Sequence, residues 1–259
     1  MMKYLKNKAP SPKSQAPNSP ACGTGRKDKK QHKLTLLFLP LGLWSWNLGL
    51  GTCFLLGLGI CGLGLGTSFA QTYQLNEWDK TTLEKANTAK DIDYLTEEEK
   101  NVIFYMNLAR MNGPLFAKTF VKVYMDSTEM ESDDYAESLI KELNKSKSKA
   151  PLTSRNDLYE VAKTHAKTMG KSGKTGHYDF EKRTREIASI YDGITENCDY
   201  GPDDGFSIVM DLLIDEGIPD VGHRKTILDP DVKYIGTSIK KHKKYRYNCV
   251  MEFGGGLLK

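Results

Sequence analysis

No lysine, arginine, aspartate or glutamate occurs in residues 34–70, so this stretch lacks the charged surface of an ordinary folded domain. Residues 1–33 before it form a basic polar leader. A positive segment before an apolar run is typical of a secretory signal, and Ser-Phe-Ala at positions 68–70 resembles a cleavage site. We expect residues 34–70 to be the core of a cleaved signal peptide. The alternative is a retained membrane anchor, because the run is long enough to cross a bilayer.

Either interpretation exports the rest of the chain. The protein is then secreted, periplasmic or extracellular, or it is anchored through residues 34–70 with its domain outside the cytoplasm. Any contact with the membrane is expected only through that segment.

An excess of positive charge is missing from the exported part. Nine of the 37 lysines and arginines and one of the 33 acidic residues lie in residues 1–70. Residues 71–259 therefore carry 28 basic and 32 acidic side chains, a formal charge of −4. Nucleic-acid binding normally shows as a basic face, so we expect no nucleic-acid partner.

Cysteine is scarce in the exported part. Of five cysteines, only Cys198 and Cys249 lie beyond residue 70. A pair in an exported domain is typical of one disulfide, and we predict a bond between them. The alternative is two buried free thiols, because a pair of cysteines without known geometry proves little.

One glycine is missing from a stretch that otherwise suggests a phosphate-binding loop. Gly173, Lys174 and Thr175 match the end of that motif, but Thr168 stands where its first glycine belongs. The loop should also follow a strand and open a helix, whereas here a helical pattern precedes it. We exclude a nucleotide site and expect this segment to be a flexible exit from the helix.

The remaining pattern predicts helices first and strands last. Residues 71–94 are polar and are predicted to be a linker, followed by one domain at 95–259. A capping box of Thr96 and Glu99 opens the first clear helix. Further helical patterns begin near Pro114 and cover 135–143, 156–169 and 206–215. Strands are predicted at 234–239 and 245–253, the latter half-buried, which suggests an α+β layered domain.

Three glycine-flanked loops carry titratable residues where loops tend to present functional groups: "SGKTGHYDF" with His177, "DGITENCDYG" with Glu196 and "DEGIPDVGHRKTIL" with His223. Together with "LYEVAKTHAKTMGKSGKTGH" and the final "YNCVMEFGG", their order and spacing resemble the CAP superfamily. That superfamily comprises cysteine-rich secretory, antigen 5 and pathogenesis-related proteins. The resemblance is to its bacterial secreted branch of SCP-like domains, and it covers about residues 95–255.

The resemblance implies a three-layer α-β-α sandwich with a central, mainly antiparallel sheet. It also implies a cleft lined by two histidines and two acidic residues that can hold a divalent metal. His177, Glu196 and His223 match three of these positions. The fourth falls on Asp215, with Glu216 as the alternative, so the chain departs from the family pattern there.

Two imidazoles with carboxylates suit Zn²⁺ or another divalent cation, the candidate cofactor, with a coordination position left open for water. We predict an exported protein whose cleft binds a small-molecule, lipid or protein ligand. One alternative is a metal-dependent hydrolase using His177 and His223, with Glu196 as candidate general base. Another is a non-catalytic surface interaction module.

Overall fold

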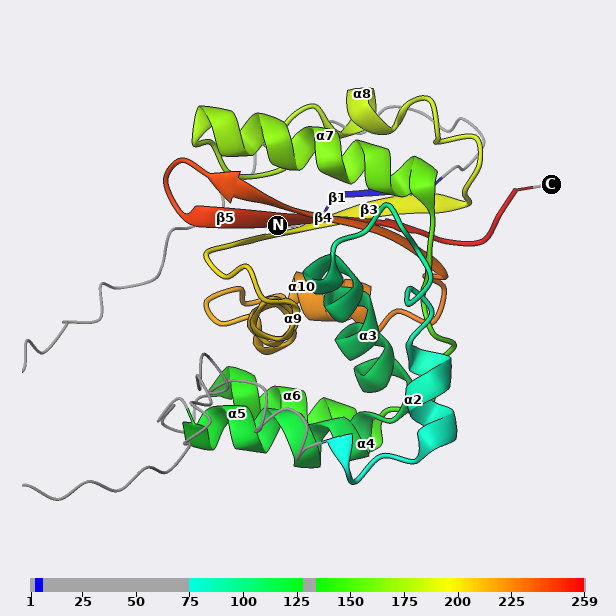
Figure 1. Ribbon diagram of the computed structural model, residues 1–259, viewed down its shortest axis with the longest axis vertical. Coiled ribbons are helices and arrows are strands. Elements are labelled where there is room, and N and C mark those ends of the chain that lie inside the picture. The colour runs from blue at the N-terminus through cyan, green and yellow to red at the C-terminus, as the bar shows by residue number, and fades with distance from the viewer. Residues whose placement is uncertain (1–2, 7–74, 128–133, 259) are drawn as a thin grey trace, which may run out of the picture.

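The computed structural model describes residues 3–6, 75–127 and 134–258 (Figure 1). The predicted signal core or anchor, residues 34–70, lies outside this part of the chain. No helix among the described residues has the length and apolar character needed to span a membrane. The helices are α2 (Lys80–Ala86), α3 (Glu97–Met111), α4 (Gly113–Phe116), a π-helix η1 (Ala117–Val121), α5 (Lys122–Ser127), α6 (Asp134–Lys145), α7 (Asn156–Ser172), α8 (Phe180–Thr184), α9 (Gly205–Ile214) and α10 (Gly222–Ile227).

The strands form one sheet in the order β1-β3-β5-β4-β2. Its bounds are β1 (Lys3–Lys6), β2 (Thr153–Ser154), β3 (Gly193–Tyr200), β4 (Tyr234–His242) and β5 (Arg246–Gly254). All pairs are antiparallel except β2 with β4. The predicted hairpin near the C-terminus is β4 with β5, and the mainly antiparallel sheet is confirmed.

Helices cover both faces of the sheet (Figure 1). α7 and α8 lie on one face, α3, α9 and α10 lie on the other, and α2, α4, α5 and α6 form a further layer beyond them. This arrangement confirms the predicted α-β-α sandwich. It corrects the prediction of a half-buried β5, because residues 248–254 are all buried and the strand is covered on both faces.

The N-terminal turn of α3 is tied to the sheet by one side chain. Thr96 and Glu99 form the predicted capping box, in which Glu99 Oε2 accepts from Thr96 N at 2.9 Å. The other oxygen, Oε1, accepts from Ile239 N of β4 at 2.8 Å and from Lys240 Nζ at 3.1 Å. Glu99 is fully buried, and these donors satisfy its carboxylate oxygens.

The segment predicted to be a linker is packed against the domain from Leu75 onward, so that prediction is wrong for residues 75–94. Trp78 is buried, and its Nε1 donates to Thr119 Oγ1 at 3.1 Å. Ala86 and Ala89 are also buried in the main core. Trp78, Ala86 and Ala89 do not form a periodic apolar pattern, so nothing in the sequence indicated that this segment packs in the core.

Gly173 ends α7 as its C-cap, with a left-handed φ of 72°. Its N–H donates to Met169 O at 2.8 Å, the bond expected at such a cap. The Gly-Lys-Thr stretch therefore closes a helix, as the sequence predicted, and does not open one.

The predicted disulfide between Cys198 and Cys249 is absent, and both are buried free thiols. In the β3–β5 register Cys198 faces Val250, whereas Cys249 faces Asp199. Because side chains alternate along a strand, a one-residue offset places the two sulfurs on opposite faces of the sheet. Cys198 packs in the cluster under α7, and Cys249 packs in the main core on the other face.

We expect both cysteines to react with an alkylating reagent in denaturant without prior reduction. Peptide mass spectrometry of the unreduced full chain should find the label on Cys198 and on Cys249. A peptide pair linked through these two residues would contradict the register described above.

A fully buried arginine, Arg110 of α3, joins the loops at one end of the sheet. Its guanidinium donates to four backbone carbonyls at 2.6–3.0 Å: Ala150, Ile227, Asp229 and Val232. Burial lowers the pKa of Arg110 to about 10, and Asp229 acts in the opposite direction. The side chain stays charged at neutral pH and connects α3 with the end of α10 and the start of β4.

Arg110→Lys should destabilise the protein by more than about 3 kcal/mol, because one ammonium cannot reach four separate carbonyls and leaves buried acceptors unsatisfied. The free energy of unfolding from urea titration measures this. The matched control, exposed Arg185→Lys, should change it by less than about 0.5 kcal/mol. Equal effects of the two substitutions would refute the role given to Arg110.

Candidate functional site: two histidine–carboxylate pairs beside β3

The first pair lies on the face of the sheet covered by α7 and α8. His177, in the loop after α7, has its Nδ1 2.7 Å from Oε1 of Glu196 on β3. Glu196 is fully buried, whereas the His177 side chain is 11% exposed. The contact fixes the imidazole orientation, because Nδ1 donates to the carboxylate.

Arg183 of α8 neutralises the same carboxylate. Its Nη2 donates to Glu196 Oε1 at 3.0 Å, and its Nη1 lies 2.8 Å from Glu196 Oε2. Nη1 also donates to Oε1 of Glu252 at 2.8 Å. Glu252 is the cross-strand partner of Glu196 on β5, so one guanidinium serves two adjacent buried carboxyls.

The two carboxyls differ in protonation. Burial acts to raise the pKa of Glu196, but hydrogen bonds from His177 and Glu252 and the charge of Arg183 outweigh it and lower the pKa to about 2. Burial, followed by the charge of Glu196, raises the pKa of Glu252 well above its usual value. Oε2 of Glu252 has no other hydrogen-bond partner among the described residues, and a proton held on Glu252 and donated to Glu196 satisfies it.

His165 and Cys198 complete this cluster. His165 of α7 has its Nε2 2.8 Å from Gly176 O and 3.8 Å from Glu196 Oε1. Burial lowers its pKa, so the imidazole is neutral at neutral pH. Cys198 Sγ lies 3.9 Å from His177 Nδ1, the atom that already faces Glu196. Burial raises the pKa of the Cys198 thiol, which disfavours the reactive thiolate. Cys198, His177 and Glu196 are therefore not arranged as an activated nucleophile.

The second pair lies on the opposite face. Asp215 ends α9 in a left-handed conformation with φ 60°, and its Oδ1 lies 2.7 Å from His223 Nδ1. Its Oδ2 accepts from the backbone N of His223 at 2.9 Å, which caps α10. The predicted alternative, Glu216, is exposed and takes no part in this pair.

Arg224 fixes the corner between α9 and α10 that carries this pair. Its guanidinium donates to Leu213 O at 2.6 Å and to Ile214 O at 2.8 Å, the last carbonyls of α9. It is almost fully buried. Since Arg224 follows His223 directly, the same turn that satisfies the helix end also sets the position of the imidazole.

β3 lies between the two pairs. Glu196 points toward α8, whereas the next residue, Asn197, points to the other face and donates from Nδ2 to His223 O at 3.1 Å. Figure 1 shows α8 and α10 on opposite sides of the sheet. The predicted site residues therefore form two pairs rather than one ring of four.

One group among the described residues brings three ligand-type side chains together: His165, Glu196 and Cys198. This group does not suit a cation. Arg183 already contacts both oxygens of Glu196, and His165 Nε2 donates to a backbone carbonyl. Sequence reasoning missed Arg183, which lies in no quoted motif, and Glu252, which lies in "YNCVMEFGG" but was not singled out. The roles of both depend on the strand pairing.

Removing charge from the carboxyl pair should show strong coupling. Glu252→Gln keeps a donor toward Glu196 and should cost less than about 1 kcal/mol at neutral pH, whereas adding Glu196→Gln leaves Arg183 buried without a counter-charge and should cost about 3–5 kcal/mol. Urea denaturation of both single variants and the double variant measures this. A Glu252→Gln variant as unstable as the double variant would contradict a protonated Glu252.

The pH dependence of the same variants has a defined sign. The contribution of Glu196 is present above its usual pKa of 4.5 and is lost as pH falls towards 2. Glu252 has a raised pKa, so its contribution is lost as pH rises. The stability of Glu252→Gln relative to wild type should therefore increase between about pH 5 and about pH 8.

Comparison with known proteins gives one family. The model of the CAP family, described as the cysteine-rich secretory protein family, matches residues 105–253. No curated protein matches the chain.

Two similar solved structures are bacterial. An extracellular protein containing an SCP domain from Bacillus anthracis strain Ames is 14% identical, with 56% of this chain and 40% of that chain covered and a TM-score of 0.36. An outer surface protein from Borrelia burgdorferi is 23% identical, with 47% of this chain and 88% of that chain covered and a TM-score of 0.35. The match spans less than half the length of the Bacillus protein.

Proposed function

The chain belongs to the cysteine-rich secretory protein (CAP) family, and we propose that it is an extracellular ligand-binding protein in which His177 and His223 are two separate ligand contacts, one on each face of the sheet. Export is supported by the uncharged segment 34–70 and the basic residues before it. The role of the two histidines as ligand contacts is supported by the geometry of the two pairs.

A single observation carries the proposal. Each imidazole has its Nδ1 2.7 Å from a carboxylate, Glu196 for His177 and Asp215 for His223. Among the described residues, neither Nε2 has a hydrogen-bond partner. An imidazole held by a carboxylate at one nitrogen and open at the other is the arrangement that metal-binding histidines use, since the carboxylate fixes the tautomer and raises basicity.

A divalent ion is the candidate ligand, and the imidazole of each pair can supply one of the donors that it needs. The carboxylates of Glu196 and Asp215 are occupied as hydrogen-bond partners, so each pair offers one imidazole to an ion that water would complete, not a closed four-ligand zinc site. In this proposal His177 and His223 would each offer one ligand to a separate ion, which would supply a positive centre for an anionic or carbonyl group. Glu196 and Asp215 orient the imidazoles.

The proposal gives Glu196 no catalytic role. A general base works best with a pKa near the working pH, and the pKa of Glu196 is about 2 because its hydrogen bonds and Arg183 outweigh burial. The carboxylate is also fully buried. A ligand-binding protein therefore accounts for this residue better than a hydrolase does.

Isothermal titration of the full chain with Zn²⁺ tests the metal part. We expect each of His177→Ala and His223→Ala to weaken at least about tenfold the binding of an ion at that histidine and to leave the other histidine unaffected, because the two pairs lie on opposite faces of the sheet. The matched control is His165→Gln, which keeps a donor toward Gly176 O and should bind like wild type.

Unchanged binding in both alanine variants would overturn the assignment of these histidines. Loss in only one variant would indicate a site at that histidine alone. Absence of binding to the wild-type chain would exclude the divalent ion as the ligand.

A further inference from the structure

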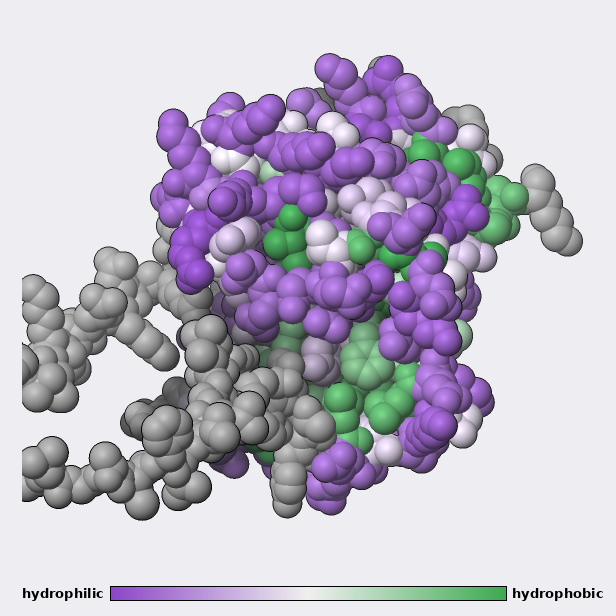
Figure 2. Space-filling view, in the orientation of Figure 1, coloured by the Kyte–Doolittle hydropathy of each residue, from purple (hydrophilic) through white to green (hydrophobic). Residues whose placement is uncertain are grey.

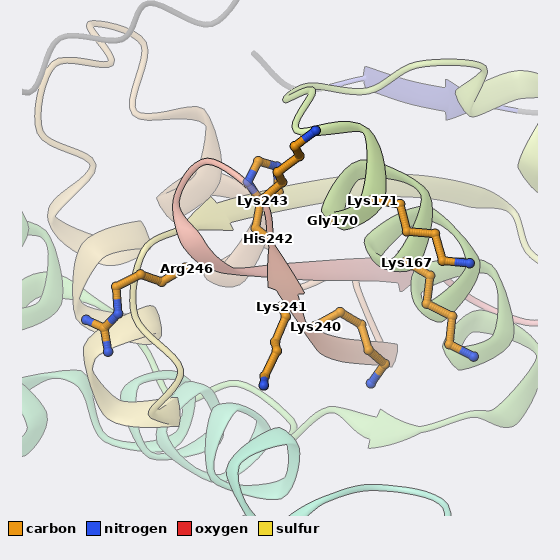
Figure 3. Close-up of a pocket in the computed structure, with 8 residues that line it drawn as sticks. All are labelled: Lys167, Gly170, Lys171, Lys240, Lys241, His242, Lys243 and Arg246. Atoms are coloured by element: carbon orange, nitrogen blue, oxygen red, sulfur yellow. The ribbon is translucent and has the colours of Figure 1, made fainter.

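A basic pocket of about 460 Å³, which no residue of either histidine pair lines, lies between the C-terminal half of α7 and the β4–β5 hairpin (Figure 3). No acidic residue lines it. Six of its eight lining residues carry a permanent positive charge, and the full set is Lys167, Gly170, Lys171, Lys240, Lys241, His242, Lys243 and Arg246. Figure 2 shows a largely hydrophilic surface over α7 and the neighbouring strands.

Most of this charge is not neutralised within the domain. Lys240 pairs with Glu99 at 3.1 Å, whereas the other five cations form no ion pair in the described part of the chain. Residues 71–259 carry a formal charge of −4, so the pocket concentrates positive charge on an otherwise acidic domain. The negative end of α7 favours Lys171, but it does not account for the cations on the hairpin.

The pocket walls are held together by backbone contacts. Lys243 N donates to Gly170 O at 3.0 Å. A Cβ on Gly170 would lie 2.2 Å from Lys241 O, so only glycine permits this close approach of α7 to β4.

His242 is buried and connects the tip of the β4–β5 hairpin to the segment after α7. Its Nδ1 accepts from Lys244 N and Tyr245 N at 3.2 Å each, so the proton lies on Nε2, which donates to Lys174 O at 3.0 Å. The cations are therefore presented on a preformed scaffold, which reduces the entropy cost of binding.

The arrangement of the cations indicates the shape of the partner. In Figure 3 the charged side chains leave α7 and the hairpin in several directions and spread around the pocket instead of meeting at one point. This spacing suits several negative charges along an extended chain better than a single phosphate. The exposed large hydrophobic residues, Val123, Tyr178, Leu257 and Leu258, do not line the pocket, so it lacks the apolar anchors of a bilayer-binding surface.

We propose that this pocket binds a linear acidic polysaccharide bearing sulfate, phosphate or carboxylate groups. The choice of a polysaccharide rests on the extracellular location in the proposed function, whereas the polyanion requirement rests on the pocket alone. Binding depends on lysines that the histidine pairs do not contact, so the two sites act independently.

Lysine acetylation footprinting of the full chain, with heparin as the polyanion, tests this at single residues. Heparin should slow acetylation of Lys167, Lys171, Lys241 and Lys243 by at least about fivefold, as expected for cations held against a polyanion. The remote exposed residues Lys118, Lys141 and Lys233 should change by less than about twofold. Site resolution separates the pocket from the basic residues 1–33, which also attract polyanions.

A matched pair of triple variants adds an affinity measurement. Lys171→Gln with Lys241→Gln and Arg246→Gln should weaken heparin binding at least about tenfold relative to Lys118→Gln with Lys141→Gln and Lys233→Gln, which removes equal charge elsewhere. Equal affinity of the two triples, or uniform lysine protection, would overturn the pocket. Selective protection by phosphatidylglycerol vesicles but not by heparin would overturn the polysaccharide in favour of a membrane.

Failure of this proposal is distinguishable from failure of the proposed function. In the His177→Ala variant heparin should protect the pocket lysines as it does in wild type, because His177 does not line the pocket. Loss of zinc binding with intact heparin protection would refute the histidine sites but support the pocket. Intact zinc binding without heparin protection would refute the pocket but support the histidine sites.

Discussion

The alternation of side chains along β3 determines how chemistry is distributed in this domain. Glu196 and Cys198 point toward α7 and α8, whereas Asn197 points toward α10. A ring of titratable residues that looks continuous in sequence is therefore divided between two layers. The same alternation, applied to the register with β5, separates the two cysteines and makes a disulfide geometrically impossible without moving a strand.

Three arginines stabilise this divided arrangement. Arg183 balances the charge of Glu196, while Arg110 and Arg224 satisfy carbonyls at helix ends and loops. Each guanidinium contacts groups from at least two elements, which a shorter or less branched cation could not do. The positions of His177 and His223 thus depend on cations that do not touch a ligand in the proposed function.

Local patterns predicted much of the fold. The capping box of α3, the periodicity of α7, its glycine cap and the C-terminal hairpin all depend on neighbouring residues, and all are present. Contacts between residues far apart in the sequence could not be predicted. The burial of Trp78 depends on Thr119, the burial of Glu252 depends on α7 covering β5, and the roles of Arg183 and His242 depend on pairings that only the folded chain creates. His177, Glu196, Asp215 and His223 were singled out from sequence as candidates, but their arrangement as two separate pairs was not predicted.

Glu99 links events at distant points of the chain. Its two oxygens serve the first turn of α3 and the backbone of β4, and Lys240 at the edge of the basic pocket shares one of them. If either the start of α3 or the part of β4 at Ile239 and Lys240 unfolds, the Glu99 carboxylate loses hydrogen bonds to that element. The helix start, the strand and that wall of the pocket therefore belong to one cooperative unit, whose backbone amides would exchange with solvent together.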